Sequence, residues 1–115
     1  MNVSDCLFCK IVGKEIPAEI VRETDEVIAF KDINPAAPTH VLVIPKRHIA
    51  SAQDLTSADG DMLGALFETM AELARETQLE GGHRIVTNVG PDAGQSVHHL
   101  HFHLLGGRQM AWPPG

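Results

Sequence analysis

Three histidines, His99, His101 and His103, occupy every second position near the C-terminus, with Leu100 and Phe102 between them. Side chains alternate between the two faces of a β-strand, so a strand here turns all three imidazoles to one face. Neutral imidazole serves at neutral pH as a nucleophile, a base and a metal ligand. Four of the seven histidines of the chain lie in this one segment, which predicts a chemically active row.

The spacing of the row favours covalent catalysis over metal binding within the strand. Side chains on one face of a strand are roughly 6.5–7 Å apart along it, so His99 and His103 are about twice that distance apart. Three ligands of one zinc ion each lie only about 2 Å from the metal. The row therefore favours His101 as a central nucleophile, with a flanking group on each side.

The loop before the row, residues 88–96, has a composition that suits oxyanion binding. Gly90 and Gly94 let backbone N–H groups approach an oxyanion, and Gln95 and Ser96 add further donors. Beside three aligned histidines, this composition predicts a place for a phosphoryl or acyl oxygen.

Hydrophobic periodicity predicts the elements that hold these residues. A stripe at spacings of four and three predicts a helix over 59–79, with Ser57 as N-cap and Gly81-Gly82 as its stop; the stripe is Met62, Leu66, Met70 and Leu73. A short turn or helix is expected at 6–14. Strands are expected at 19–22, 27–31, 40–44, 84–88 and 97–105. These elements predict an α+β domain with a mainly antiparallel sheet.

Composition limits the class of protein. The chain has 115 residues, 43% of them hydrophobic and 21% charged, which is typical of a single globular domain. A net charge of −6 argues against a nucleic-acid polymer as partner, although a single nucleotide is compatible with it. With no apolar run of membrane length and no secretory signal at the start, we expect no membrane partner and a cytoplasmic location.

One motif connects the chain to a known family. Residues 94–105 (GQSVHHLHFHLL) closely resemble the signature of the histidine-triad (HIT) proteins. Further segments resemble the Hint branch, the purine nucleotide-binding phosphoramidases: FKDI at 30–33, APTH at 37–40, VIPKRH at 43–48 and GGRQMAWPPG at 106–115. The resemblance implies a HIT-like fold, with an antiparallel sheet of about five strands, one long helix and a short N-terminal helix. It implies a tail at 1–5, a HIT domain at 6–108 and a C-terminal tail at 109–115.

The resemblance also implies a role for each site residue. His101 attacks the α-phosphate and forms a nucleotidyl-histidine intermediate, His99 and His103 flank it, and His40 orients the row from behind. Ser96 assists at the phosphate. The implied nucleotide-binding residues are Asp32, Ile33, Asn88, Gly94, Gln95, Ser96, His101 and His103.

The implied activity is hydrolysis of a purine nucleoside 5′-phosphoramidate to AMP or GMP and an amine. No cofactor is required for catalysis, because imidazoles and hydrogen-bond donors neutralise a single α-phosphate. We expect a homodimer built on the long helix and a sheet edge, with the tail 109–115 reaching toward the partner's active site. The alternatives are a non-catalytic nucleotide-binding or scaffold protein, a dinucleoside polyphosphate hydrolase and a metal-binding module.

Cys6 and Cys9 form a separate C-x-x-C motif, which needs two more ligands to hold zinc. Several bacterial relatives pair such cysteines with two histidines, and the resemblance implies a structural zinc site of Cys6, Cys9, His48 and His99. The alternative is a pair of reduced cysteines in the core.

Overall fold

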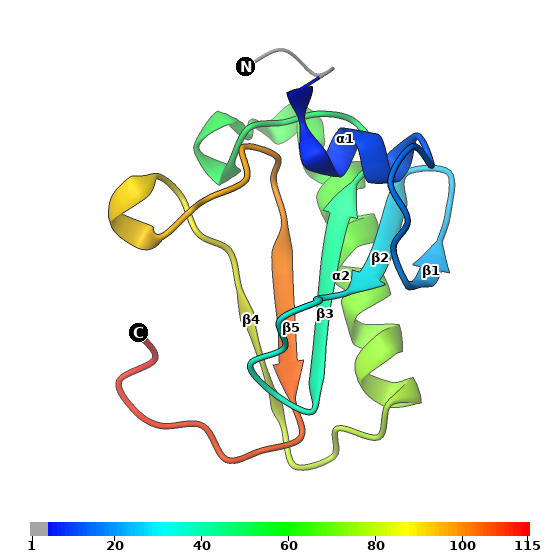
Figure 1. Cartoon of the computed structure of the whole chain (residues 1–115). Helices are drawn as coiled ribbons and strands as arrows, with labels where there is room; N and C mark the ends of the chain where they lie inside the picture. The colour runs from blue at the N-terminus through cyan, green and yellow to red at the C-terminus, as the bar shows by residue number, and fades with distance from the viewer. Residues whose placement is uncertain (1–4) are drawn as a thin grey trace.

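The computed structural model describes residues 5–115, so that residues 1–4 of the predicted tail 1–5 lie outside the described residues. Across residues 5–115 the chain forms a five-stranded antiparallel sheet in the order β1-β2-β3-β5-β4 (Figure 1). The strands are β1 (Ile20–Glu23), β2 (Val27–Lys31), β3 (Thr39–Pro45), β4 (His83–Val86) and β5 (Phe102–Gly106). The predicted α+β fold is confirmed.

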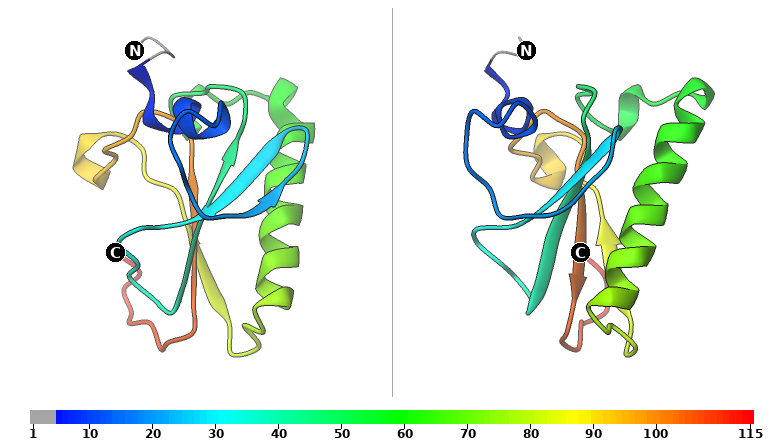
Figure 2. Two further views of the ribbon diagram at one scale, coloured as in Figure 1. Left: turned by 45° about the vertical axis from the view of Figure 1, so that its right-hand side comes forward. Right: turned by 90° about the vertical axis from the view of Figure 1, so that its right-hand side faces the viewer.

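Two helices of very different length cover the two faces of the sheet (Figure 2). The long helix α2 (Gly60–Glu76) packs against one face through its predicted stripe, and the short helix α1 (Leu7–Val12) lies over one end of the other face. Leu100, Phe102 and Leu104 belong to the core cluster on the α2 side. The predicted alternation is confirmed, because His101 contacts Phe8 of α1 on the opposite side.

The strand that carries the histidines is shorter than predicted. β5 begins at Phe102, whereas the sequence pattern predicts a strand over 97–105. Just before β5, backbone carbonyls bond to side chains instead of to a neighbouring strand. The ring of His101 donates to the carbonyl of His99 at 2.7 Å, and the hydroxyl of Thr87 donates to the carbonyl of His101 at 2.8 Å. His99 and His101 thus lie in an irregular extended segment that leads into the strand.

β1, β3 and β4 differ from the expected ranges by one or two residues at each end, whereas β2 matches the expected 27–31. The long helix starts and stops at different signals from those predicted. Thr56, not Ser57, caps a short 3₁₀ turn (Ser57–Asp59) before α2, and its hydroxyl accepts from the N–H of Ala58 at 3.2 Å. Gln78, at φ 58°, turns the chain beyond Glu76 before Gly81 is reached. Among the described residues, no helix is long and apolar enough to cross a membrane.

Replacing Thr56 by alanine should lower the free energy of unfolding by about 1 kcal/mol, because the N–H of Ala58 loses its acceptor. Urea denaturation followed by circular dichroism measures this loss. Ser57→Ala is the matched control and should change stability much less, since Ser57 lies inside the turn. Equal losses in the two variants would contradict the capping that the structure shows.

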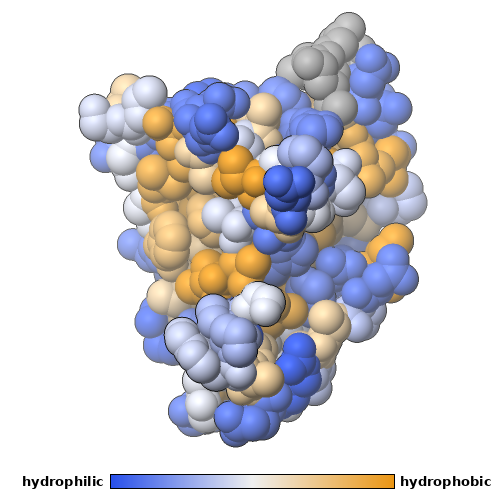
Figure 3. Space-filling model, turned by 90° about the vertical axis from the view of Figure 1, so that its left-hand side faces the viewer, coloured by the Kyte–Doolittle hydropathy of each residue, from blue (hydrophilic) through white to orange (hydrophobic). Residues whose placement is uncertain are grey.

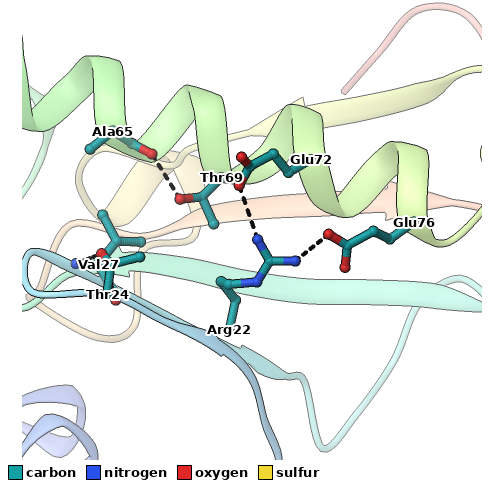
Figure 4. A network of polar contacts seen from close by, with 7 residues as sticks. All are labelled: Arg22, Thr24, Val27, Ala65, Thr69, Glu72 and Glu76. Carbon is teal, nitrogen blue, oxygen red and sulfur yellow. Dashed lines mark hydrogen bonds and ion pairs between the residues drawn. The ribbon is translucent and has the colours of Figure 1, made fainter.

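An arginine fork fastens α2 to the edge strand β1 (Figure 4). Arg22 donates to Glu72 at 3.0 Å and also to Glu76, one helical turn further along. These side chains are partly exposed, so the pairs orient the helix more than they stabilise it.

Candidate active site and metal cluster

A pair of histidines from two neighbouring strands lies at the centre of the candidate active site. His40 on β3 and His103 on β5 meet with 2.9 Å between His40 Nε2 and His103 Nδ1. The N–H of Ala36 donates to His40 Nδ1 at 3.0 Å, so neutral His40 carries its proton on Nε2 and donates it to His103. His103 then carries its own proton on Nε2, where it forms a donor for an oxyanion.

Asp32 completes this pair from the loop after β2. Its Oδ2 lies 3.4 Å from His40 Nε2, while its Oδ1 accepts from the N–H of Asn34 at 2.8 Å. The second contact is the turn-capping role that aspartate commonly has before Asn-Pro. One carboxylate therefore holds the loop and places negative charge beside His40.

His101 is buried, and a backbone carbonyl selects the tautomer of its neutral ring. Its Nδ1 donates to the carbonyl of His99 at 2.7 Å, which leaves Nε2 of the neutral ring with a free lone pair. The ring centroid lies 5.2 Å from that of His103. The ring with a free lone pair is thus adjacent to the ring with an N–H donor, an arrangement that suits nucleophilic attack on a phosphate.

Phe8 is a functional neighbour that sequence reasoning missed. Its ring packs edge-on against His101 at 5.1 Å and against His99 at 6.1 Å, although it lies more than ninety residues away in the chain. The only signal in the sequence is its position between Cys6 and Cys9. A buried phenylalanine beside a nucleophile excludes water from one side of the imidazole.

Burial lowers the pKa of His103 below its ordinary value of 6.5, and the neighbouring His101 and His40 lower it further. The charge of Asp32 opposes this shift but does not reverse it. A histidine whose pKa is lowered by folding takes up its proton more readily in the unfolded chain.

Stability should therefore be fully present above about pH 6.5, the ordinary histidine value, and should fall as acid protonates the unfolded chain. Urea denaturation between pH 7.5 and 5.5 measures this dependence, and a His103→Gln variant should show a shallower slope. The exposed His83 provides the control, since His83→Gln should leave the slope unchanged. A His103→Gln slope equal to that of the wild type would contradict the lowered pKa.

The loop before the row is held in shape by Gln95. Its amide accepts from the N–H of Gly90 at 2.9 Å and donates to the carbonyls of Ala50 and Val97 at 2.8 and 3.1 Å. Gly90 and Gly94 both have a φ of 83°, which favours glycine. The predicted phosphate contact of Gln95 stays a prediction, because here its side chain bonds to the backbone.

The remaining predicted nucleotide contacts lie on the loop before the histidine row and next to Asp32 in the chain. Gly94 and Ser96 are exposed on the loop, and Asn88 is half-buried at its start. Ile33 is 91% exposed beside Asp32, a position in which a large apolar side chain is free to contact a flat base.

The second cluster joins the neighbouring Cys6 and Cys9 to two histidines that lie far from them in the sequence. The metal-ligating atoms of Cys6, Cys9, His48 and His99 all lie within 4.8 Å of one another. The Nδ1 of His99 is 3.4 Å from Cys6 Sγ and 3.5 Å from Cys9 Sγ, and His48 Nδ1 is 3.2 Å from Cys9 Sγ. Two ligands of tetrahedral zinc lie roughly 3.5 Å apart, so the four residues fit this metal.

Both ring nitrogens of His99 have partners in the structure. This residue is fully buried, and its Nε2 donates to the carbonyl of Pro45 at 2.8 Å, which leaves the Nδ1 lone pair directed at the two sulfurs. His99 therefore has no free ring nitrogen for the catalytic flanking role that was predicted for it. Burial and the neighbouring Cys6 raise the pKa of Cys9 to about 11, a shift that a bound cation reverses.

Comparisons with known proteins show which proteins the chain resembles in sequence and fold. The HIT domain family profile matches residues 13–110. A HIT family hydrolase from Legionella pneumophila, known from its crystal structure, is 51% identical with a TM-score of 0.95, over 96% of this chain and 100% of that chain. A 14 kDa zinc-binding protein of Zea mays is 48% identical over 120 residues, which cover 100% of this chain and 91% of that protein. A histidine triad nucleotide-binding protein from Candida albicans is 33% identical with a TM-score of 0.81, over 96% of this chain and 85% of that chain.

Proposed function

The chain belongs to the HIT domain family, and from this membership we propose that it hydrolyses purine nucleoside 5′-phosphoramidates. The observation that carries the proposal is the pair of histidine tautomers that the hydrogen bonds select at the candidate active site. His101 offers the Nε2 lone pair, and His103 beside it offers an N–H donor. A nucleophile next to a donor suits attack on a phosphorus whose oxygens gain charge.

Covalent attack divides the proposed reaction into two displacements. The substrate reacts with its amine nitrogen protonated, so the P–N bond breaks to release a neutral amine while His101 Nε2 bonds to phosphorus. Water then displaces His101 from the nucleotidyl-histidine, giving the nucleoside monophosphate and one proton. The Nε2–H of His103 donates to a phosphate oxygen in both steps, and His40 holds it in that protonation state.

The nucleotide in this proposal lies along the exposed edge of the histidine pair. Asp32 accepts from the ribose hydroxyls and Ile33 contacts the purine. Gly94 and Ser96 donate to phosphate oxygens from the loop that Gln95 shapes, and Asn88 lies beside the ribose. The Candida albicans relative, named for nucleotide binding, supports this class of ligand.

We propose that zinc is bound by Cys6, Cys9, His48 and His99 in a structural role. All four positions of a tetrahedral ion are taken by protein groups, which is typical of structural and not of catalytic zinc. The metal would stabilise the fold and supply no chemistry to the phosphate. The name of the Zea mays relative supports the choice of metal.

Incubation of the purified protein with adenosine 5′-phosphoramidate tests the proposed activity, with AMP measured by chromatography. Diadenosine polyphosphates serve as the competing substrates. AMP from the phosphoramidate at a far higher kcat/KM is the expected result. A preference for the dinucleotides would replace the proposed activity with the alternative one, and nucleotide binding without turnover would leave a non-catalytic protein.

We propose in addition that two copies associate through α2 and the edge strand β4. A groove of about 460 Å³ lies between them, lined by Phe67, Ala71, Leu79 and Ile85 among others. Phe67 is 48% exposed and Ile85 37% exposed, and hydrophobic surface gathers on this side of the molecule (Figure 3). A second copy that pairs its own β4 here would cover both the strand edge and the groove.

The C-terminal tail lies on the same side as β4. Arg84 of β4 donates to the carbonyl of Ala111 at 3.0 Å, and Trp112 beyond it is 83% exposed. A partner subunit that packs over Trp112 would bring the tail 109–115 toward the partner's active site.

Replacing Ile85 by lysine should convert the dimer into a monomer, because a charge would enter the apolar contact between the copies. Sedimentation at micromolar concentration measures the change. Ile20→Lys is the matched control, since Ile20 is similarly exposed (38%) on the opposite edge strand β1. A wild-type protein that sediments as a monomer would contradict the proposed assembly.

A further inference from the structure

The metal cluster and the nucleophile are joined by the short helix α1. Cys6 and Cys9 stand on either side of Phe8, and the Sγ of Cys6 accepts from the N–H of Cys9 at 3.3 Å. The ring of Phe8 lies edge-on to His101 at 5.1 Å. Whatever holds the two sulfurs in place therefore also holds the ring that packs against the nucleophile.

A second connection runs through the backbone of His99. The ring of His99 is held at both nitrogens, by the Pro45 carbonyl on one side and the sulfur pair on the other. Its own carbonyl accepts the Nδ1 proton of His101 at 2.7 Å. The position of that carbonyl decides which nitrogen of His101 keeps the lone pair, so the restraint on the ring acts on the reacting atom.

We propose that the metal held by Cys6, Cys9, His48 and His99 positions the nucleophile His101 through these two contacts. His99 and Phe8 are then positioning residues, and metal occupancy sets the rate of the reaction as well as the stability of the fold. The inference rests on the proposed function, because it assigns the regulation of that same site.

Loss of the cation frees both contacts together. The two sulfurs and His99 are then no longer bound to the same ion, so the ion no longer connects α1 to the segment before β5. The Nδ1–H of His101 then loses a fixed acceptor, and the ring spends part of its time with the proton on Nε2, where it cannot attack. Substrate binding through Asp32 and the loop is left in place, so kcat falls and KM changes little.

The test compares the full chain loaded with zinc, stripped with a chelator and reloaded with zinc chloride, all at one pH. We expect kcat for adenosine 5′-phosphoramidate to fall about fivefold to tenfold on stripping, the size of one lost hydrogen bond, and to recover on reloading. In protein with ¹⁵N-labelled histidine, the Nδ1–H signal of His101 should be sharp in the loaded form and exchange-broadened in the stripped form. If the His101 signal and kcat are both the same in the loaded and stripped forms, the inference is overturned.

The spectrum separates this inference from the proposed function. A His101 signal that changes with zinc, in a protein inactive on phosphoramidates, would contradict the proposed function but support the positioning of His101 by the metal.

Phe8→Leu tests one of the two contacts without removing the metal, which matters if the stripped chain unfolds. We expect it to retain one zinc per chain and lose about threefold in kcat, while Phe102→Leu, the same change on the α2 face, retains kcat. Equal kcat in Phe8→Leu and wild type would overturn the role of Phe8.

Discussion

His101→Ala is expected to lower the rate of phosphoramidate hydrolysis by at least about 10⁴-fold, because no other group at the site can form the covalent bond. The buried ring touches Phe8 and the carbonyl of His99, and alanine leaves the remaining framework of strands intact. Nucleotide affinity should change by less than about tenfold, since the ribose and phosphate contacts remain.

Steady-state kinetics and isothermal titration with AMP measure these two effects. His98→Ala is the matched control, since His98 lies in the same segment but is exposed. It should keep nearly full turnover. A His101→Ala protein with turnover close to that of the wild type would rule out the covalent mechanism. A loss of AMP binding in parallel with turnover would show that the variant damages the site as a whole.

Cys6→Ser is expected to remove bound zinc and to lower the free energy of unfolding by about 4 kcal/mol. This is the stabilisation given by a ligand present at about a thousand times its Kd, and it corresponds to roughly 15 °C in melting temperature for a domain of this size. The reason is that Cys6 is buried with its sulfur against His99, so the remaining three ligands cannot close the tetrahedron.

Elemental analysis and thermal denaturation measure these two quantities, with and without chelator. The wild type should lose stability when the chelator is added, whereas Cys6→Ser should be unaffected by it. His83→Ala, which removes an exposed histidine outside the cluster, should retain zinc and its melting temperature. Wild-type protein purified without chelator and found free of zinc would contradict the structural metal site.

Local patterns in the sequence predict much of the secondary structure of this protein. The unbroken apolar run at 40–44 identifies a central strand because both faces of that strand are buried. The stripe of Met62 and Leu66 identifies a helix because burial of one face imposes a period that survives in the sequence. The alternation of His101 and His103 with Phe102 likewise predicts which side chains share a face. The fold class, the long helix and the row of histidines were therefore determined by the sequence.

The exact ends of elements depended on interactions that periodicity does not contain. Ser57 is a slightly better cap than Thr56 by residue type, and only the path of the chain selects Thr56. β5 begins only at Phe102 because the ring of His101 occupies the carbonyl of His99, which a strand ladder would otherwise use. A side chain that bonds back to its own segment leaves no trace in the hydrophobic pattern.

The arrangement of the site was decided by tertiary structure alone. Nothing in the local sequence indicates that Phe8 meets His101 or that Gln95 bonds to three backbone groups. The proton positions of His40 and His103 follow from the N–H of Ala36, whose direction is set by the loop. Sequence determines which residue types are present, but a neutral imidazole has two possible proton sites, and the folded neighbours decide which one is occupied.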